Sequence, residues 1–339
     1  MNFVVLFCFN ALVSAAAIVP EHYIRLNDTS AAVEPHWPHI YLDGKSGYAY
    51  ANPQGLALLD ARHIAYTAAT RLSRPKQLSE LFDWNCTEPR FCRTFSIGNS
   101  VRGHPIKGAR LTDFKTLSHR HRAQFVYIGN IHGDETVGRY VLARLIEDLQ
   151  HKRNSNFLQH LDIYIIPSVN PDGFLLGRRT NANGYDLNRN FPDQFGWETH
   201  PRQLETQHIM NFMHTHNFSM GANLHGGDIV ANYGFDGNKE RRSGQYCAAP
   251  DDRTLSYISS VYARQHERMM KSREFPGGIT NGCHWYVLYG GLQDWAYLNR
   301  TQYHITLELS YVKDPMRLQP YWPENRDALY AYMRHAFAF

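Results

Sequence analysis

His132 and Glu135 are two possible metal ligands that stand three residues apart in the chain. They follow an apolar segment at residues 124–128, which reads as a strand, and precede a helical pattern. An imidazole nitrogen and a carboxylate oxygen on one tight turn suit a zinc ion. His225 also stands directly after an apolar segment, residues 218–224, and before two glycines. Ligands bind beyond the carboxyl ends of strands in open α/β sheets, so the three side chains are predicted to meet there.

Three protein ligands would leave the fourth zinc position for water, which is the pattern of a hydrolytic site rather than a structural one. The alternative interpretation is that these are ordinary surface residues, because the chain holds 19 histidines and a lone His-x-x-Glu is common. The shared placement of His132 and His225 beside glycines at strand ends favours the metal site.

Glu308 is the candidate general base. It lies in the alternating segment 303–309, in which the isoleucine and leucines face one way and Glu308 faces the other. A carboxylate in an apolar strand is costly unless it has a partner. One interpretation is an edge strand with a solvated glutamate face. The other is a carboxylate beside zinc that takes a proton from a water acidified by the metal.

A long irregular stretch, residues 170–197, contains further side chains of functional type. Loops of this length inside a compact domain are often functional. Arg178, Arg179 and Arg189 lie in it, and arginine suits a bidentate grip on a substrate carboxylate. The alternative interpretation is an ordinary surface loop held by salt bridges.

The segments that must position these residues alternate between strand and helix patterns. Strands are predicted at residues 124–128, 161–166, 218–224 and 303–309, and a hairpin is predicted over 93–112. Helices are predicted over residues 137–149, after 204, over 251–269 and over 322–333. This alternation predicts a layered α/β domain with a largely buried sheet.

Composition limits the function classes. The chain has 339 residues, of which 43% are hydrophobic and 19% charged, which suits one large core with a small appendage. The formal net charge is +4, and the sequence has no lysine and arginine stripe with interleaved aromatics. No nucleic-acid partner is therefore implied.

The N-terminal residues read as a targeting segment. Residues 1–17 contain an apolar run at 3–9 and small residues at 14–17, as in a secretory signal peptide. The alternative is a membrane anchor, but the run is shorter than the roughly 20 residues that span a bilayer, so no membrane span is predicted. Residues 18–57 are rich in Pro, Gly and His, and we expect an irregular N-terminal extension there.

Sequons and cysteines agree with export. N-glycosylation sequons begin at Asn27, Asn85, Asn217 and Asn299. Besides Cys8 in the signal segment, the chain has an even number of cysteines, which permits three pairings: Cys86, Cys92, Cys247 and Cys283. The first two are close enough in sequence to bridge locally. The absence of a Cys-x-x-Cys motif argues against cysteine as a zinc ligand.

The order of these segments resembles the zinc metallocarboxypeptidase family, within it the regulatory N/E-type branch and its carboxypeptidase D-like enzymes. The resemblance runs from about residue 60 to the end and rests on several stretches in the right order: 127–135, 170–173, 186–193, 223–227, 278–282, 290–294 and 306–310. It implies an α/β fold in which a mixed twisted β-sheet is sandwiched between α-helices. It also implies that residues 58–339 form the catalytic domain.

The resemblance implies roles for the residues of the reaction centre. His132, Glu135 and His225 would hold one Zn²⁺ ion. Glu308 would act as general base and then as acid toward the leaving amine. Arg179 would polarise the scissile carbonyl and stabilise the oxyanion.

The resemblance also implies a substrate pocket. Asn188 and Arg189 would bind the terminal carboxylate of the substrate, and Tyr286 would close over it. Asp236 matches the acidic residue by which this branch selects C-terminal Lys or Arg, with Gln293 as its neighbour. A partly buried carboxylate favours a cationic side chain and rejects an apolar one. The alternative for Asp236 is a plain turn residue.

The chain departs from the family pattern at several positions. Gly234-Phe235 stands where the branch has proline and an aromatic residue, Cys283 where a small residue is common, and Tyr311 where cysteine often follows. The sequence stops after one predicted helix, where the branch adds a transthyretin-like β-domain.

We therefore expect a secreted, monomeric zinc exopeptidase that removes C-terminal Lys or Arg from peptides or proteins. The first alternative is a catalytically inactive homologue that only binds C-terminal peptides. The second is an intracellular enzyme that trims acidic C-termini, which would need a basic pocket in place of Asp236.

Overall fold

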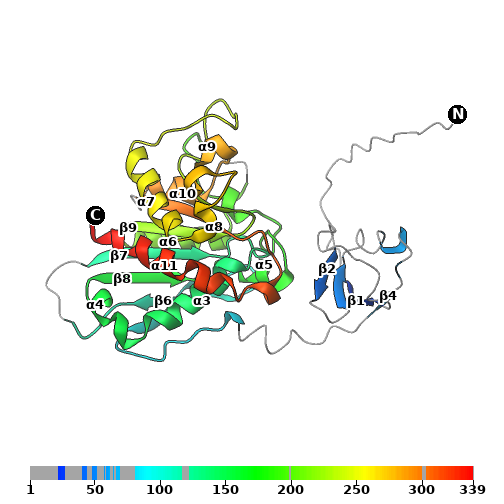
Figure 1. The fold of residues 1–339 in the computed structure, drawn as a ribbon, viewed down its shortest axis with the longest axis horizontal. Helices are drawn as coiled ribbons and strands as arrows, with labels where there is room; N and C mark the ends of the chain where they lie inside the picture. The colour runs from blue at the N-terminus through cyan, green and yellow to red at the C-terminus, as the bar shows by residue number, and fades with distance from the viewer. Residues whose placement is uncertain are drawn as a thin grey trace. The chain divides into compact units, whose positions relative to one another are not determined.

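The computed structural model describes residues 81–116, 122–197, 200–299 and 303–338, together with short segments between residues 22 and 68. The predicted signal peptide over residues 1–17 and the sequon at Asn27 lie outside the described residues. The chain divides into two compact units, Met1–Lys76 and Gln77–Phe339 (Figure 1).

Short strands form an antiparallel sheet in the first unit: β1 (His22–Leu26), β2 (Ile40–Asp43), β3 (Tyr48–Ala51) and β4 (Tyr66–Ala68). Their order is β2-β3-β1-β4. The first three lie in residues 18–57, for which the sequence predicts an irregular segment. Tyrosine and isoleucine favour strands. Runs of four or five residues are too short for their alternation to stand out among the surrounding Pro, Gly and His.

An eight-stranded sheet forms the second unit, in the order β11-β10-β12-β9-β7-β8-β6-β5. Its strands are β5 (Cys92–Asn99), β6 (Pro105–Leu111), β7 (Ala123–Gly129), β8 (Leu161–Ile166), β9 (Phe218–His225), β10 (Ile229–Tyr233), β11 (Ile279–Asn281) and β12 (Tyr303–Leu309). The central strands β8, β7, β9 and β12 are parallel, whereas β5, β6 and β10 add antiparallel pairs. The sheet is therefore mixed, as predicted.

The α-helices of this unit are α3 (Val137–Leu149), α4 (Ser155–Leu158), α5 (Pro171–Leu176), α6 (Leu204–His214), α7 (Asp252–Arg264), α8 (Glu267–Met270), α9 (Gly282–Trp285), α10 (Leu292–Asn299) and α11 (Tyr321–Arg334). Short 3-10 helices are η1 (Lys152–Asn154), η2 (Leu187–Arg189), η3 (Pro276–Gly278), η4 (Pro315–Arg317) and η5 (His335–Ala338). Within the described residues, no helix has the length and apolar character needed to cross a membrane.

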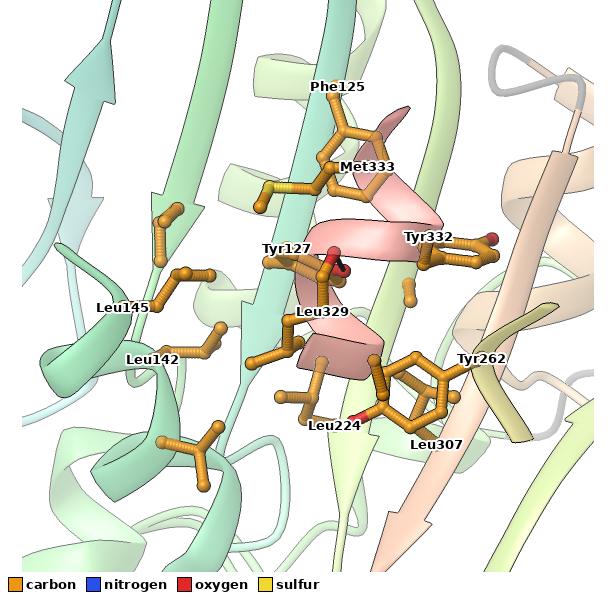
Figure 2. Close-up of a cluster of buried hydrophobic side chains, with 14 of the residues drawn as sticks. Phe125, Tyr127, Leu142, Leu145, Leu224, Tyr262, Leu307, Leu329, Tyr332 and Met333 are labelled. Atoms are coloured by element: carbon orange, nitrogen blue, oxygen red, sulfur yellow. Dashed lines mark hydrogen bonds between the residues drawn. The ribbon is translucent and has the colours of Figure 1, made fainter. Parts of the chain in front are cut away.

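Side chains alternate across β7, so this strand contributes to a core on each face of the sheet. Phe125 and Tyr127 pack with apolar residues of α3, α7 and α11. Val126 and Ile128 pack with those of α6 and α10. Figure 2 shows the first of these cores, where Leu329 and other α11 side chains lie over β7. Helices cover both faces of the sheet, which confirms the predicted α/β fold.

Buried tyrosine hydroxyls tie α11 to the sheet. Tyr127 donates to the carbonyl of Leu329 at 3.1 Å, and Tyr332 donates to the carbonyl of Gly221 at 2.9 Å. A buried hydroxyl is tolerated only when it has such a partner. These two bonds therefore fix where α11 lies along the central strands that carry the site.

We expect His304, in the middle of β12, to make folding sensitive to acid. Its side chain is fully buried, and neither ring nitrogen has a hydrogen-bond partner among the described residues. Burial lowers the pKa of His304 from 6.5 to about 3. The unfolded chain therefore gains a proton as the pH falls below 6.5, and stability is lost progressively down to about pH 3.

Urea unfolding at two pH values tests this. Between about pH 7.5 and 4.5, His304→Leu should lose about 3 kcal/mol less unfolding free energy than the unaltered protein. His151→Leu, at an exposed position, is the matched control and should leave the pH dependence of the unfolding free energy unchanged. Full acid sensitivity in His304→Leu would contradict the assignment.

Candidate metal centre and adjoining pocket

The loop after β7 carries His132 and Glu135 to the sheet edge where β9 ends at His225. Since β7 and β9 are neighbouring parallel strands, their carboxyl ends lie side by side. Asn130 adopts a left-handed backbone (φ 55°), and its amide nitrogen donates to three carbonyls of this loop at 2.8–3.2 Å. This side chain holds the loop in shape, and the structure brings all three predicted ligands to one edge.

One atom from each ligand faces the other two. Glu135 Oε2 lies 3.1 Å from His132 Nδ1 and 3.0 Å from His225 Nδ1, and the two Nδ1 atoms are 3.1 Å apart. All three side chains are buried. No other cluster of three or more His, Cys, Asp or Glu side chains in the described part of the chain has a spacing that could hold a metal ion.

The charge states of Glu135 and His225 suit a cation at this point. Burial opposes the charge on Glu135, but His132 and His225 outweigh it and hold the pKa of Glu135 well below its usual range. Burial lowers the pKa of His225, which favours the neutral imidazole that binds metals. Burial also opposes charge on His132, yet Glu135 and Asp186 raise its pKa overall. A carboxylate and two imidazole nitrogens directed at one point are a donor set that fits zinc.

Two further side chains orient the ligands. His132 Nε2 lies 2.9 Å from Asp186 Oδ1, and that carboxylate is fixed by the backbone N–H of Asn188 at 2.9 Å. His225 Nε2 lies 2.8 Å from the Asn223 amide. Such contacts set the ring orientation and tautomer of metal-binding histidines. Neither Asp186 nor Asn223 was predicted from the sequence to have a role. The position of Asn223, two residues before His225 and so on the same strand face, was an available signal.

Glu308 faces the metal ligands from an interior strand. β12 lies between β9 and β10, and Glu308 is in register with His225 of β9. Its side chain is buried, and Oε2 has no hydrogen-bond partner among the described residues. Burial raises the pKa of Glu308 well above its usual value, and the charges of Glu135 and Asp228 add to this. The alternative of a solvated edge strand is therefore excluded.

The arginines of the long loop differ in their partners. Arg179 donates from Nη1 to Glu135 Oε1 and from Nε to Asp186 Oδ2, both at 3.0 Å. Arg189, on η2, donates to the carbonyl of Asn188 at 2.9 Å and forms no ion pair with any described residue. The Asn188 side-chain oxygen accepts from the backbone N–H of Leu292 at 2.9 Å, which fixes η2 against α10.

Asp236 is a buried carboxylate in the pocket beside the metal ligands. Its Oδ1 accepts from the amide of Asn232 at 2.9 Å and from that of Gln293 at 3.0 Å. Burial raises the pKa of Asp236 to about 6. Behind it, Asp294 accepts from the Asp236 backbone N–H at 2.9 Å. Asp294 was not predicted from the sequence to have a role, because its partner lies 58 residues away.

Tyr286 also lines this pocket and directly follows α9. Its side chain is 39% exposed, and its ring contacts that of Trp285 at 4.7 Å between centroids. Burial raises the pKa of Tyr286 to about 12, so its hydroxyl remains a hydrogen-bond donor at neutral pH.

One cavity of about 170 Å³ joins these groups. Eight of the ten predicted site residues line it: His132, Glu135, Arg179, Asn188, His225, Asp236, Tyr286 and Glu308. Of the other two, Gln293 donates a hydrogen bond to Asp236, and the charge of Arg189 acts to lower the pKa of both Asp236 and Tyr286.

Known proteins share this sequence pattern. A family model described as zinc carboxypeptidase matches residues 79–328. Carboxypeptidase SOL1 of Arabidopsis thaliana is 40% identical over 250 residues, which cover 71% of this chain and 50% of SOL1. Carboxypeptidase D of Homo sapiens is 37% identical over 272 residues, which cover 73% of this chain and 20% of that protein. The chain thus spans about half the length of SOL1 and a fifth of carboxypeptidase D.

Solved structures share the fold. Thrombin-activatable fibrinolysis inhibitor (TAFI) aligns with a TM-score of 0.65 at 18% identity, covering 94% of this chain and 98% of that one. Carboxypeptidase A from Helicoverpa armigera aligns with a TM-score of 0.61 at 16% identity, covering 95% and 98%. These two likenesses show the fold alone. The family model and the sequence relatives show more, and we conclude that the chain belongs to the zinc carboxypeptidase family.

Proposed function

We propose that this protein releases Lys or Arg from the C-terminus of peptides and proteins. The observation that carries the proposal is Asp236, a buried carboxylate in the cavity that also holds the metal ligands. Its charge favours a cationic side chain, whereas an apolar side chain would leave the carboxylate without a partner. The amides of Asn232 and Gln293 hold one carboxylate oxygen and so fix the orientation of this charge.

The substrate's terminal carboxylate would bind at Arg189 and Asn188. Arg189 has no anionic partner among the described residues, and a guanidinium binds a carboxylate bidentately. The Tyr286 hydroxyl, a donor at neutral pH, would close the pocket over the same carboxylate. An internal peptide bond offers no anion to these groups, which is the physical reason to expect an exopeptidase.

The chain's own groups divide the chemistry. His132, Glu135 and His225 would hold the zinc ion, which when bound acts as a Lewis acid toward water and the scissile carbonyl. Glu308 would take a proton from the attacking water and deliver it to the leaving amine nitrogen. A nearby divalent cation favours the ionised carboxylate that this base needs, opposing the effect of burial.

Arg179 would stabilise negative charge on the carbonyl oxygen. Its side chain is 40% exposed and lines the cavity, and Glu135 and Asp186 orient its guanidinium. A fixed donor aimed at developing charge in a partly dry site lowers the barrier more than the same donor would in water.

We also propose that the protein is exported and glycosylated. The signal-like residues 1–17 support this, as do the exposed sequon residues Asn85, Asn217 and Asn299. The disulfides Cys86–Cys92 and Cys247–Cys283 are typical of an oxidising compartment.

Glu308→Gln should separate catalysis from binding. The amide cannot accept the proton, so we expect kcat to fall by about 10²–10⁴-fold. The zinc content and the affinity for a peptide ending in Arg should stay within about twofold of those of the unaltered protein. The reason is that Glu308 is proposed neither to bind zinc nor to bind the peptide. Glu267→Gln, an exposed change on α8, is the control.

Kinetics, metal analysis and peptide titration read out this variant. Loss of zinc, or unchanged turnover, would contradict the role of Glu308. An unaltered protein that binds zinc and peptide without turnover would instead support the inactive peptide-binding homologue.

Asp236→Asn should remove the preference for basic termini. The substitution keeps the oxygen that accepts from Asn232 and Gln293 but removes the charge. For two peptides that differ only in a last residue of Arg or Leu, the ratio of kcat/KM should fall by about 100-fold. Asp83→Asn, at an exposed position, should leave the ratio unchanged. An equal loss on both peptides would reject the pocket.

The same ratio should depend on pH. The pKa of Asp236 is about 6, so the carboxylate is charged above this pH and neutral below it. The Arg-to-Leu ratio of kcat/KM should therefore fall as the pH is lowered from 7.5 through about 6 to 5. Titrations of Glu308 and of the metal centre affect both peptides and cancel in the ratio. A constant ratio in the unaltered protein across this range would refute the prediction.

A further inference from the structure

The substrate pocket has two walls from separate parts of the chain. Residues 232–238 comprise the end of β10 and the loop after it, and they form the first wall, which carries Asp236. Residues 281–289 contain α9 and form the second wall, which carries Tyr286. The walls meet closely, because a Cβ at Gly282 would lie only 1.9 Å from Asp236 Oδ1. A small shift of the second wall therefore acts directly on the carboxylate.

The Cys247–Cys283 disulfide links the second wall to a third segment of the chain, which contains Cys247. Phe235 of the first wall donates its N–H to the Cys247 carbonyl at 3.0 Å and accepts from the Cys283 N–H at 2.9 Å. Asn281 bridges the same groups, since its amide nitrogen donates to the carbonyls of Gly234 at 3.1 Å and Cys247 at 3.0 Å. The disulfide and these hydrogen bonds therefore connect Cys247 to both walls of the pocket.

The turn that carries Tyr286 has little secondary structure of its own. α9 is a single turn of four residues, which is too short to be stable by itself. Tyr286 follows directly and donates its N–H to the Gly282 carbonyl at 2.9 Å. Further along, Leu288 donates its N–H to the Asp236 carbonyl at 2.8 Å. Cys283, fully buried within this turn, is the covalent anchor of the wall.

We infer that the Cys247–Cys283 disulfide is a positioning element of the substrate pocket, which holds Asp236 and Tyr286 in the arrangement that binds a basic C-terminal residue. The inference rests on the proposed function and adds a covalent determinant of specificity to it. The disulfide contributes no group to the metal centre, since the hydrogen bonds of Cys247 and Cys283 go to the two walls and to Gly244. Opening it should weaken substrate binding and leave the zinc ligands in place.

The first test compares two zinc-loaded double variants. Cys247→Ala with Cys283→Ala opens the pocket disulfide, and Cys86→Ala with Cys92→Ala opens the disulfide at the start of β5 as the control. For the pocket variant, we expect KM for a peptide ending in Arg and Kd for free L-arginine to rise about 10-fold. Its kcat should stay within about threefold, and its zinc content should be unchanged. The control should match the unaltered protein.

An unchanged Kd for L-arginine in the pocket variant would overturn the inference. So would a fall in kcat and zinc content with unchanged KM, or an equal effect in the control variant. These outcomes would mean that the disulfide stabilises the fold without positioning the pocket.

The second test uses the folded, unaltered protein and so does not depend on variant folding. Tris(2-carboxyethyl)phosphine reduces the disulfide to two thiols and is itself oxidised to the phosphine oxide. Alkylation and mass spectrometry report which cysteines are free, while calorimetry reports the Kd for L-arginine. The Kd should rise as Cys247 and Cys283 become free and recover after reoxidation with oxidised glutathione.

These experiments distinguish failure of the proposed function from failure of the inference about the disulfide. An unaltered protein that hydrolyses neither the Arg nor the Leu peptide would contradict the proposed function alone, because L-arginine binding is measured without turnover. Equal L-arginine affinity with the pocket disulfide closed and open would contradict the inference alone.

Discussion

Two imidazoles and a carboxylate directed at one buried point are the constraint on which the rest of the structure depends. Their atoms lie 3.0–3.1 Å apart, and burying such groups is costly unless a cation or proton joins them. Parallel pairing of β7 with β9 brings His132 and His225 together, and pairing of β9 with β12 adds Glu308 in register with His225. The sheet thus determines the site through its strand order.

The charged side chains around these three residues balance one another only in part. Asp186 contacts His132 and also pairs with Arg179, so one carboxylate supports both a proposed metal ligand and the cation proposed to stabilise the oxyanion. Arg189 is left without an ionic partner among the described residues, and Asp236 keeps a carboxylate in the pocket. An extended ligand with an anionic end and a cationic side chain would satisfy both, which links the electrostatics of the pocket to the proposed substrate.

The sequence predicted the residues at strand ends better than their partners. His132, His225 and the alternating strand of Glu308 are local patterns, so they could be read from spacing. Whether β12 is an edge or an interior strand depends on β10, which pairs with it from more than 70 residues earlier in the chain. Asp294 likewise acquires meaning only from its contact with the Asp236 backbone. The short strands of the first unit and the choice among three cysteine pairings also could not be predicted without the fold. The Cys86–Cys92 bridge is the exception, because its two cysteines are close in sequence.

X-ray absorption at the zinc edge, on the purified and metal-loaded protein, tests the central claim most directly. The account predicts one zinc per chain with two imidazole nitrogens and a carboxylate oxygen from the protein in its coordination shell, and no sulfur. A spectrum with sulfur ligands, with fewer than two imidazoles, or with no stoichiometric zinc would contradict it.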